Sequence, residues 1–492
     1  MRLQQPAQPA SARSVRAPLS LVVDPAFSAS SLGSDPSLWY SRLLGGMSAS
    51  STLADNIMLS GDSYTTGRDG GNYVEALLMA LRATGDRQFL DRVYTLTEEA
   101  RTKLRDPWLN GTTDGYSAWL WLADSTNATY YGKDTNWLDE SITSGNVALW
   151  AYAFQLNRGV DPKFATAADF WKGWLETQFL AKWYHRANGD SLGAWNTPYL
   201  AFYKPDVEPR SANWRLAYYM WKLTGNAFYK SRTDEIVAQL TAAQVSNPSH
   251  PGAFRWAQQL DPSTQIWMAT NYANYYIRVA IEMNLENQSY FSSPATMKAF
   301  AATFRDVVYP GSLPGLTTMT HAVNGGGSTG YALYAFNGLA AWDSTGALMN
   351  LANLSITGVG HYASGGLSKA ARNDVYMSGY ALAALAIKQA VSLEVEGMAP
   401  DPARLASSVP NPFTGSTQIR FTLPRAGRVR VTILDANGRA LNVLEQGGLT
   451  AGPWTCDWDG RDRAGAETPP GMYLALVESG TQRVVVRLTR LR

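Results

Sequence analysis

One pattern of apolar and polar residues recurs through most of this chain. A segment of aromatic and small apolar residues, opened by Gly, Ser or Asn, is followed by a short turn and then by a more charged segment. Two clear copies run from Gly71 to Leu81 and from Ser211 to Leu223, with the turns Thr84-Gly85-Asp86 and Thr224-Gly225-Asn226 and with charged segments from Gln88 to Leu104 and from Phe228 to Ala243. Each copy predicts a hairpin of two helices.

Four further openings follow the same pattern, at residues 144–146, 271–272, 329–331 and 378–380. Their second helices are expected at 165–180, 294–307 and 345–354, and the stretch 36–44 supplies a partner for the sixth. Six hairpins fit a closed ring, an (α/α)6 toroid, and an open α-solenoid with the same pairing is the alternative. We favour closure because the copies are six rather than many.

The two helices of each hairpin differ as a ring requires. The stretch Val147 to Phe154 is apolar nearly all round, which suits a helix buried on both sides. The stretch Arg92 to Arg105 carries one apolar stripe and a charged opposite face, which suits an outer helix. The apolar helices are therefore expected on the inside of the ring.

After Val391 the helical pattern stops and a Pro-containing stretch without periodicity begins. Beyond it, short apolar or alternating runs predict strands at 417–423, 428–434, 472–477 and 484–488. The predicted fold is thus mainly α, a toroid followed by a small immunoglobulin-like β-sandwich. We expect a leader or disordered segment over 1–35, the toroid over 36–393, a linker over 394–409 and the sandwich over 410–492.

Several short motifs mark turns and core positions of the predicted sandwich. Asp459-Gly460 and Pro470-Gly471 supply turn geometries that other residues adopt only with strain. Trp458 and Tyr473 are expected as core anchors, and the nearby Asp457, Asp459 and Asp462 are expected to cap their own turns rather than to bind calcium. The full set is Pro410-Asn411-Pro412-Phe413, the turn 423–427, the strand 429–435 with Gly438-Arg439, the stretch 458–462, Gly465 and Pro470-Gly471-Met472-Tyr473.

In order and spacing, this set resembles the FlgD-like immunoglobulin-type domains, including the C-terminal sorting modules of type IX secretion. The resemblance covers nearly the whole module. It implies export and attachment to a cell surface rather than catalysis, with the secretion machinery as a partner. The basic residues near the end of the module are compatible with such a transport signal: Arg483, Arg487, Arg490 and Arg492.

Composition limits which other partners, disulfides and metal clusters can be expected. The counts of 17 Trp and 25 Tyr, with 45% hydrophobic residues, allow a large core. Lys and Arg number 42 against 40 Asp and Glu, so no strong field is expected to hold nucleic acid or anionic lipid. A single cysteine, Cys456, excludes an intrachain disulfide and a thiolate zinc cluster.

The sequence offers no membrane-spanning stretch and no clear signal peptide. No run of about 18 apolar residues exists, so no transmembrane helix is expected. Near the N-terminus the apolar run Ala17 to Val23 is broken by Pro18 and Ser20 and is shorter than a signal-peptide core. The resemblance nevertheless implies a secreted or cell-surface protein.

The predicted helical part resembles (α/α)6 toroids in general layout only. That architecture hosts glycoside hydrolases, polysaccharide lyases, epimerases and terpenoid- or lipid-modifying enzymes, so the fold alone does not choose a reaction. In such a ring, the N-terminal ends of the inner helices are the expected ligand site, because loops converge there and the helix dipoles favour anions. The segments before the inner helices combine carboxylates with aromatic residues, a composition typical of saccharide clefts.

A glycosidase needs two carboxyl groups on either side of the scissile bond. We expect Asp139 or Glu140 to lie opposite Asp206 or Glu208 as the catalytic pair, although each acid could instead cap a helix or carry a solvated loop charge. Candidate substrate-binding residues are Asp69, Trp137, Trp195, Tyr199, Tyr272, His361 and Asp374, with Trp195 as a stacking floor.

Two alternatives to hydrolysis remain open. In a polysaccharide lyase, His321 in its glycine-rich loop could act as a base beside Tyr331 and abstract the proton next to a uronate carboxyl group, or His321 could simply cap a turn. A non-catalytic surface protein that binds glycan or peptide would use the acids only as caps. No metal motif, nucleotide-binding loop or nucleophile elbow stands out, so no cofactor and no metal are expected.

Overall fold

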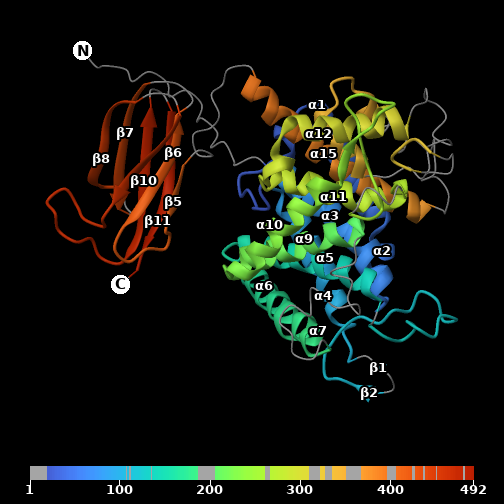
Figure 1. Ribbon diagram of the computed structural model, residues 1–492. Helices are drawn as coiled ribbons and strands as arrows, with labels where there is room; N and C mark the ends of the chain where they lie inside the picture. The colour runs from blue at the N-terminus through green and yellow to red at the C-terminus, as the bar shows by residue number, and fades with distance from the viewer. Residues whose placement is uncertain are drawn as a thin grey trace, which may run out of the picture. The chain divides into compact units, whose positions relative to one another are not determined.

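The computed structural model describes residues 19–106, 108–109, 112–134, 136–186, 206–260, 266–309, 322–326, 335–350, 367–395, 406–423, 427–435, 438–449, 452–479 and 482–491. The chain divides into two compact units (Figure 1). One is helical and spans Pro18–Lys388, and the other contains Gln389–Arg492. Each unit has its own hydrophobic core.

The helical unit is built from inner helices and the outer helices that cover them. The inner helices are α3 (Gly71–Thr84), α5 (Trp137–Leu156), α9 (Val207–Thr224), α11 (Thr270–Leu285), α13 (Ala335–Gly338) and α15 (Leu367–Val395). The outer layer contains α1 (Ser34–Ala49), α2 (Ser51–Met58), α4 (Arg87–Arg101), α6 (Pro162–Trp174), α7 (Ala181–Arg186), α10 (Ala227–Ala243) and α12 (Pro294–Ala302).

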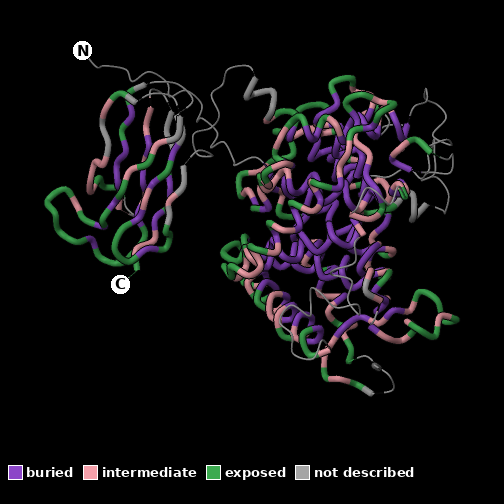
Figure 2. Tube along the Cα trace, in the orientation of Figure 1, coloured by how far each residue is buried: buried purple, intermediate pink, exposed green. Residues whose placement is uncertain are grey.

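Short elements connect and extend these helices. They are the 3-10 turns η1 (Ala29–Ser31), η6 (Ser289–Ser292) and η8 (Leu339–Trp342), the π-helical turns η2 (Thr65–Gly70), η3 (Leu175–Leu180) and η7 (Thr303–Val308), and two small hairpins, β1 (Trp108–Leu109) with β2 (Thr112–Thr113) and β3 (Gln244–Ser246) with β4 (Phe254–Trp256). Figure 2 shows that buried residues concentrate along the inner helices.

Successive inner helices approach closely at small residues. A Cβ added to Gly145 of α5 would come within 2.6 Å of the Ala212 carbonyl oxygen of α9. Gly338 of α13 likewise fits between Ile281 of α11 and Tyr380 of α15, where a Cβ would come within 2.7 Å and 2.9 Å of their side chains. Gly145 and Gly338 therefore serve helix packing, because a residue without a Cβ leaves room for the neighbouring helix.

Hydrogen bonds join further neighbours around the ring. Asn146 of α5 donates to the Gly67 carbonyl oxygen just before α3, at 2.8 Å. Arg215 of α9 donates to Glu282 of α11 at 2.7 Å, and the Ala335 amide of α13 donates to Asn274 of α11 at 3.1 Å. The contacts thus run without interruption from α3 to α15.

The ring closes between its first and last inner helices. Tyr376 of α15 donates a hydrogen bond to the Asp69 carbonyl oxygen before α3, at 3.0 Å. The rings of Tyr73 and Tyr376 also meet edge to face, with centroids 6.2 Å apart. The predicted toroid is confirmed, because an open solenoid would keep its two ends apart.

The segment that precedes α1 differs from the sequence expectation. We expected a leader or disordered segment over 1–35, but in the described part Leu19, Leu21 and Val23 are buried in the helical core. The Asn157 side chain accepts a hydrogen bond from the Val23 amide at 2.8 Å and donates one to the Leu21 carbonyl oxygen at 2.7 Å. The alternating Leu19, Leu21 and Val23 were too short a run to predict this packing from the sequence.

The second unit is an antiparallel β-sandwich. Its strands are β5 (Ala406–Val409), β6 (Thr417–Leu423), β7 (Gly427–Asp435), β8 (Ala440–Leu449), β9 (Gly452–Trp458), β10 (Gly471–Ser479) and β11 (Gln482–Arg490). One sheet has the order β11-β10-β7-β8 and the other the order β5-β6-β9. Residues 406–409 therefore form a strand rather than part of the linker expected over 394–409, because pairing with β6 compensates for the weak pattern of this short run.

The sandwich core is centred on the expected aromatic anchors. Trp458 is fully buried and packs edge to face against Phe413 and Tyr473, at centroid distances of 5.5 Å and 5.1 Å. Asp462 caps its own turn as expected, since its carboxylate accepts the backbone amides of Ala464 and Ala466, both at 2.9 Å.

Candidate active site at the N-terminal ends of the inner helices

Three inner helices bring charged side chains together at their N-terminal ends. Arg68 lies in the π-helical turn η2, directly before α3. Its Nε donates to Asp139 Oδ1 of α5 at 2.8 Å, and its Nη2 lies 3.7 Å from Glu208 Oε1 of α9. One guanidinium therefore bridges two carboxyl groups that the sequence placed on opposite sides of the candidate site.

Both acids sit in the first turn of a helix. Asp139 follows Asn136, whose side chain caps α5 by accepting the amides of Leu138 and Asp139. Glu208 is the second residue of α9. The first turn of a helix presents free amide groups and the positive end of the dipole, so it favours a negative charge.

Aromatic rings surround the Arg68 guanidinium. Its Cζ lies 5.2 Å from the ring centroids of both Tyr64 and Tyr275, which is within cation–π range. Tyr64 is 42% exposed and Tyr272 of α11 is 36% exposed, so the cluster borders solvent. Exposed tyrosine rings beside paired acids offer a face on which a sugar ring can stack.

The two acids differ in their electrostatic surroundings. Burial raises the pKa of Glu208 to about 7, Arg68 opposes this shift, and the charges of Asp139 and Asp206 add to it. Burial also raises the pKa of Asp139, but the direct hydrogen bond from Arg68 favours its ionised form. Glu208 Oε1 is buried and has no hydrogen-bond partner among the described residues.

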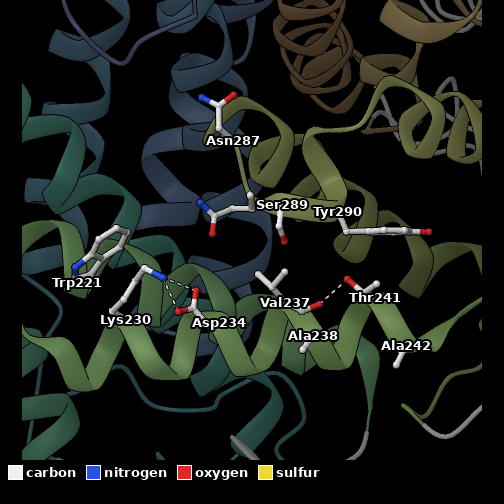
Figure 3. A pocket seen from close by; sticks show the side chains of 11 residues that line it. Trp221, Lys230, Asp234, Val237, Ala238, Thr241, Ala242, Asn287, Ser289 and Tyr290 are labelled. Carbon is white, nitrogen blue, oxygen red and sulfur yellow. Dashed lines mark hydrogen bonds and ion pairs between the residues drawn. The ribbon is translucent and has the colours of Figure 1, made fainter. Parts of the chain in front are cut away.

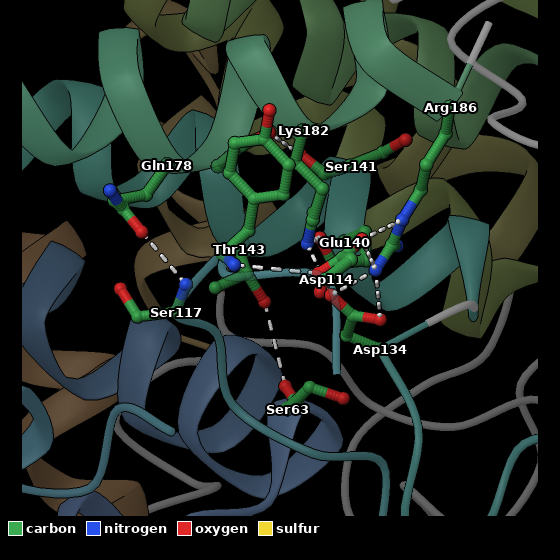
Figure 4. Close-up of polar contacts among 12 residues, drawn as sticks. Ser63, Asp114, Ser117, Asp134, Glu140, Ser141, Thr143, Gln178, Lys182 and Arg186 are labelled. Atoms are coloured by element: carbon green, nitrogen blue, oxygen red, sulfur yellow. Dashed lines mark hydrogen bonds and ion pairs between the residues drawn. The ribbon is translucent and has the colours of Figure 1, made fainter. Parts of the chain in front are cut away.

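Glu140 belongs to a different cluster (Figure 4). Lys182 of α7 is fully buried and lies 2.6 Å from Asp134 and 3.2 Å from Glu140. Arg186 joins the same cluster at 3.0 Å from Asp134 and 2.8 Å from Asp114. These ion pairs tie residues 114 to 134 to α5 and α7, which favours a structural role for Glu140.

Burial raises the pKa of Glu140 to about 7, with Lys182 opposing the shift and Asp134 adding to it. A raised pKa therefore does not by itself distinguish Glu140 from Glu208. The contacts of the two acids distinguish them, because Glu140 pairs with Lys182 inside the fold whereas Glu208 faces Asp139 across Arg68.

A buried ionic network lies below the Arg68 cluster, at the centre of the ring. Glu75 of α3 accepts hydrogen bonds from Arg278 Nε of α11 at 2.9 Å and from Arg215 Nη1 of α9 at 3.0 Å. Burial acts to raise the pKa of Glu75, but Arg215 and Arg278 overcome it and lower the pKa to about 2. Arg215 also pairs with Glu282, and the hydroxyl of Tyr380 donates to Glu75.

The other predicted acids occupy separate positions. Asp69 pairs with Arg372 at 3.2 Å, beside the closure of the ring. Asp206 precedes α9 and forms an isolated β-bridge with Gln259, and its charge acts on Glu208. Asp374 packs beside Gly46 of α1, where a Cβ added to the glycine would come within 3.1 Å of the Asp374 Cβ.

Several predicted residues fall outside the described part of the chain. Trp137 begins α5, but its side chain is not described. The remaining predictions that lie outside the described residues concern Trp195, Tyr199, His321, Tyr331 and His361. Their roles stay predictions.

Sequence reasoning missed several residues of the cluster and the network. Arg68 stands beside Asp69 in a segment where acids were the expected catalytic groups, and Tyr275 stands between Asn274 and a second tyrosine, where nothing marks it. A detectable signal was present, because Glu75 interrupts an otherwise apolar inner helix and Arg278 lies one turn from Glu282 on α11. A charge inside an all-round apolar helix requires a buried partner.

A depression with a volume of about 800 Å³ lies at the other ends of α9 and α11 (Figure 3). It is lined by Trp221, one face of α10 that includes the ion pair of Lys230 with Asp234, and the segment 287–290. It contains none of the predicted site residues. The candidate active site therefore rests on the Arg68 cluster and not on this depression.

The described residues provide neither a metal cluster nor a membrane span. In that part of the chain, no three His, Cys, Asp or Glu side chains come together as a potential metal site. Among the helices described, none combines the length and the apolar character needed to cross a bilayer.

The fold and the cluster define a two-part protein, an (α/α) toroid with paired acids at the N-terminal ends of its inner helices and an immunoglobulin-like sandwich. Residues 407–483 match the family model of the FlgD Ig-like domain, which confirms the resemblance drawn from the C-terminal motifs. The sequence matches no curated protein.

Several solved structures similar to this chain are glycoside-cleaving enzymes by name. An inactive variant of the alpha-1,6-mannanase GH76A of Salegentibacter sp. HEL1_6, in complex with alpha-1,6-mannotetrose, shares 13% identity at a TM-score of 0.37, over 70% of this chain and 99% of that one. A reducing-end-xylose releasing exo-oligoxylanase shares 14% identity at a TM-score of 0.36, over 64% of this chain and 81% of that one. The GH127 beta-L-arabinofuranosidase of Geobacillus stearothermophilus T6 shares 10% identity at a TM-score of 0.32, over 91% of this chain and 82% of that one. Likenesses this loose assign no role to any residue here.

Proposed function

We propose that this protein is a carbohydrate-active enzyme that hydrolyses glycosidic bonds in an oligosaccharide or polysaccharide. The observation that supports the proposal is the pair Asp139 and Glu208, bridged by Arg68 at the N-terminal ends of α5 and α9. Bridging by one guanidinium keeps the two carboxyl groups closer than the roughly 9.5 Å that the widest inverting pairs span.

The different surroundings of the two acids suit different roles. Glu208, with a pKa of about 7, can carry a proton at neutral pH and donate it to the glycosidic oxygen as the bond breaks. Asp139, held by Arg68 Nε, can either deprotonate an attacking water or attack the anomeric carbon itself. Either route consumes one water and yields two sugars. When Asp139 acts as base, it ends with the proton of the water and Glu208 ends deprotonated, and exchange with solvent restores both. When Asp139 acts as nucleophile, Glu208 recovers its proton from the water that hydrolyses the glycosyl-enzyme bond.

A panel of neutral and acidic polysaccharides tests this proposal through the release of reducing sugar. We expect Asp139→Asn and Glu208→Gln each to lower kcat by about 10²- to 10⁴-fold on the polymer that is cut. Glu286→Gln is a matched control, because Glu286 is a carboxylate at the other ends of the inner helices, where it accepts hydrogen bonds from Arg82 and Tyr218. It should retain its kcat at temperatures at which it remains folded.

The other outcomes of this experiment would contradict the proposal in distinct ways. Full activity in both site variants would show that the assigned acids are wrong. Ultraviolet absorbance from an unsaturated uronate product would identify a lyase. A polymer that is bound but never cut would indicate a glycan-binding protein, and the anomer of a hydrolysis product would tell whether Asp139 acts as nucleophile or base.

We also propose that the C-terminal module directs export or surface attachment, as its resemblance to type IX sorting modules implies. The test compares the full chain with a chain that ends at Val395, both produced in a bacterium that has a type IX system. The full chain is expected outside the cell and the shortened chain inside. Equal export of both would contradict a sorting role.

A further inference from the structure

Tyr275 links the candidate active site to the buried network below it. Its ring centroid lies 5.2 Å from the Cζ of Arg68 and 5.1 Å from the Cζ of Arg278. A tyrosine ring attracts a guanidinium through its negative face, so contact with two of them restrains both. The ring provides this restraint without carrying a charge of its own.

Arg278 gives this stack a fixed end. It is 1% exposed, its Nε donates to Glu75 at 2.9 Å, and its Nη1 donates to Asn72. Glu75 is in turn held by Arg215 of α9. A side chain in a network that joins three inner helices cannot change rotamer without breaking several buried hydrogen bonds.

Arg68 needs such a restraint. Its Nε is fixed by a short hydrogen bond to Asp139, whereas Nη2 stands 3.7 Å from Glu208, beyond hydrogen-bond distance. Rotation about the Nε end would carry Nη2 away from Glu208. Tyr64, the other ring beside Arg68, is 42% exposed and therefore less firmly held than the partly buried ring of Tyr275.

We propose that Tyr275 is a positioning residue of the candidate active site, whose ring, anchored beside Arg278, keeps the Arg68 guanidinium between Asp139 and Glu208. This inference rests on the proposed function only for its kinetic consequence. The placement of Arg68 can be measured without activity, because the protonation of Glu208 reports on it. Among the described residues, the charged groups that act most strongly on Glu208 include Arg68, Asp139, Asp206 and Arg278.

The test replaces the ring by an aliphatic side chain of similar size. In Tyr275→Met, Arg68 is no longer held near Glu208, so the pKa of Glu208 should rise by about one unit, because a nearby cation lowers the pKa of a carboxyl group. Tyr275→Phe retains the ring and should titrate like the parent. The readout is NMR titration of the side-chain carboxyl carbons of labelled glutamate, with Glu208 assigned through Glu208→Gln.

Tyr276→Met is the matched control. Tyr276 is the next residue of α11 and is fully buried against Trp256, Phe291 and Phe300. Its replacement should lower stability and leave the Glu208 titration unchanged. If Tyr275→Met does not fold, Tyr275→Leu replaces it, and the same rise in the pKa of Glu208 is expected.

The outcomes separate this inference from the proposed function. If Tyr275→Met and Tyr275→Leu titrate like the parent, or if Tyr275→Phe shifts as they do, Tyr275 does not position Arg68. If the aliphatic variants shift Glu208 and a polymer is cut, the alkaline limb of the pH profile of kcat/KM should move upward with Glu208. If they shift Glu208 and no polymer is cut by any form, the positioning role stands and the hydrolase proposal fails.

Discussion

Gly379 of α15 lies directly against Ala76 of α3, so closely that a Cβ on the glycine would overlap the Ala76 carbonyl group. These residues belong to the first and last inner helices and are separated by most of the helical unit. The contact closes the ring, because it joins helices that an open arrangement would leave at opposite ends. Glycine is required here by the close approach of two backbones.

Gly379→Ala should destabilise the helical unit by about 1 to 3 kcal/mol, the usual cost of forcing an extra carbon into a packed interior. Gly173→Ala in the outer helix α6 is the control, since among the described residues nothing would lie within 4 Å of a Cβ added there. It should stabilise the protein by about 0.5 to 1 kcal/mol through helix propensity. Urea unfolding measures both, and equal effects of the two substitutions would contradict the packing argument.

The periodic pattern was sufficient to predict most of the described inner and outer helices, although it did not predict α2 or α7. Segments such as α5 are apolar on all sides because they are covered both by outer helices and by neighbouring inner helices, and this double burial is visible in the composition alone. The closure between Gly379 and Ala76 was predicted only from the number of hairpins. A contact across such a sequence separation leaves no local periodic signal.

The candidate site was predictable in part, because acids at helix N-termini follow a local rule. Asp139 and Glu208 were both proposed, yet so were Glu140 and Asp206, and only the fold places Glu140 beside Lys182 instead of Arg68. Neighbouring residues on a helix point in different directions, so a one-residue difference decides which cluster an acid joins.

The ion cluster of Lys182 gives a second prediction. Lys182→Met leaves the buried carboxylates of Asp134 and Glu140 without the ammonium group, and breaking such a buried pair costs about 3 to 5 kcal/mol. The same substitution at Lys230, whose partner Asp234 is largely exposed, should cost less than about 1 kcal/mol. Urea unfolding of the two variants measures the difference.

The double variant Lys182→Met with Glu140→Gln examines the cause of that loss. The double variant should be more stable than the sum of the two single effects predicts, because glutamine needs no cation beside it. The departure from additivity should be about 0.5 to 3 kcal/mol. Thermal and urea unfolding of the four forms measure this coupling. Strict additivity would mean that Lys182 and Glu140 do not interact in solution.

Glu208 should make stability depend on pH. Its pKa is about 7 in the folded protein against an ordinary value of 4.5, so the folded state binds more protons than the unfolded chain between these values. The stabilisation from neutral Glu208 is therefore complete below about pH 4.5 and is lost as the pH rises through about 7. The difference between these two pKa values corresponds to at most about 3 to 4 kcal/mol of stability.

Glu208→Gln removes this dependence, since glutamine stays neutral at every pH. Between about pH 5 and pH 8, the free energy of unfolding of the variant should fall less than that of the parent, and urea titrations at both pH values measure the difference. Glu140→Gln should show a separate effect of the same sign, because the pKa of Glu140 is also raised to about 7. Glu75 does not interfere, because its contribution to stability is present above about pH 4.5 and is lost only as the pH falls toward about 2.

An equal decline of the free energy of unfolding in the parent and in Glu208→Gln would show that Glu208 is already ionised in the folded protein. The assignment of Glu208 as the proton donor would then have to be abandoned.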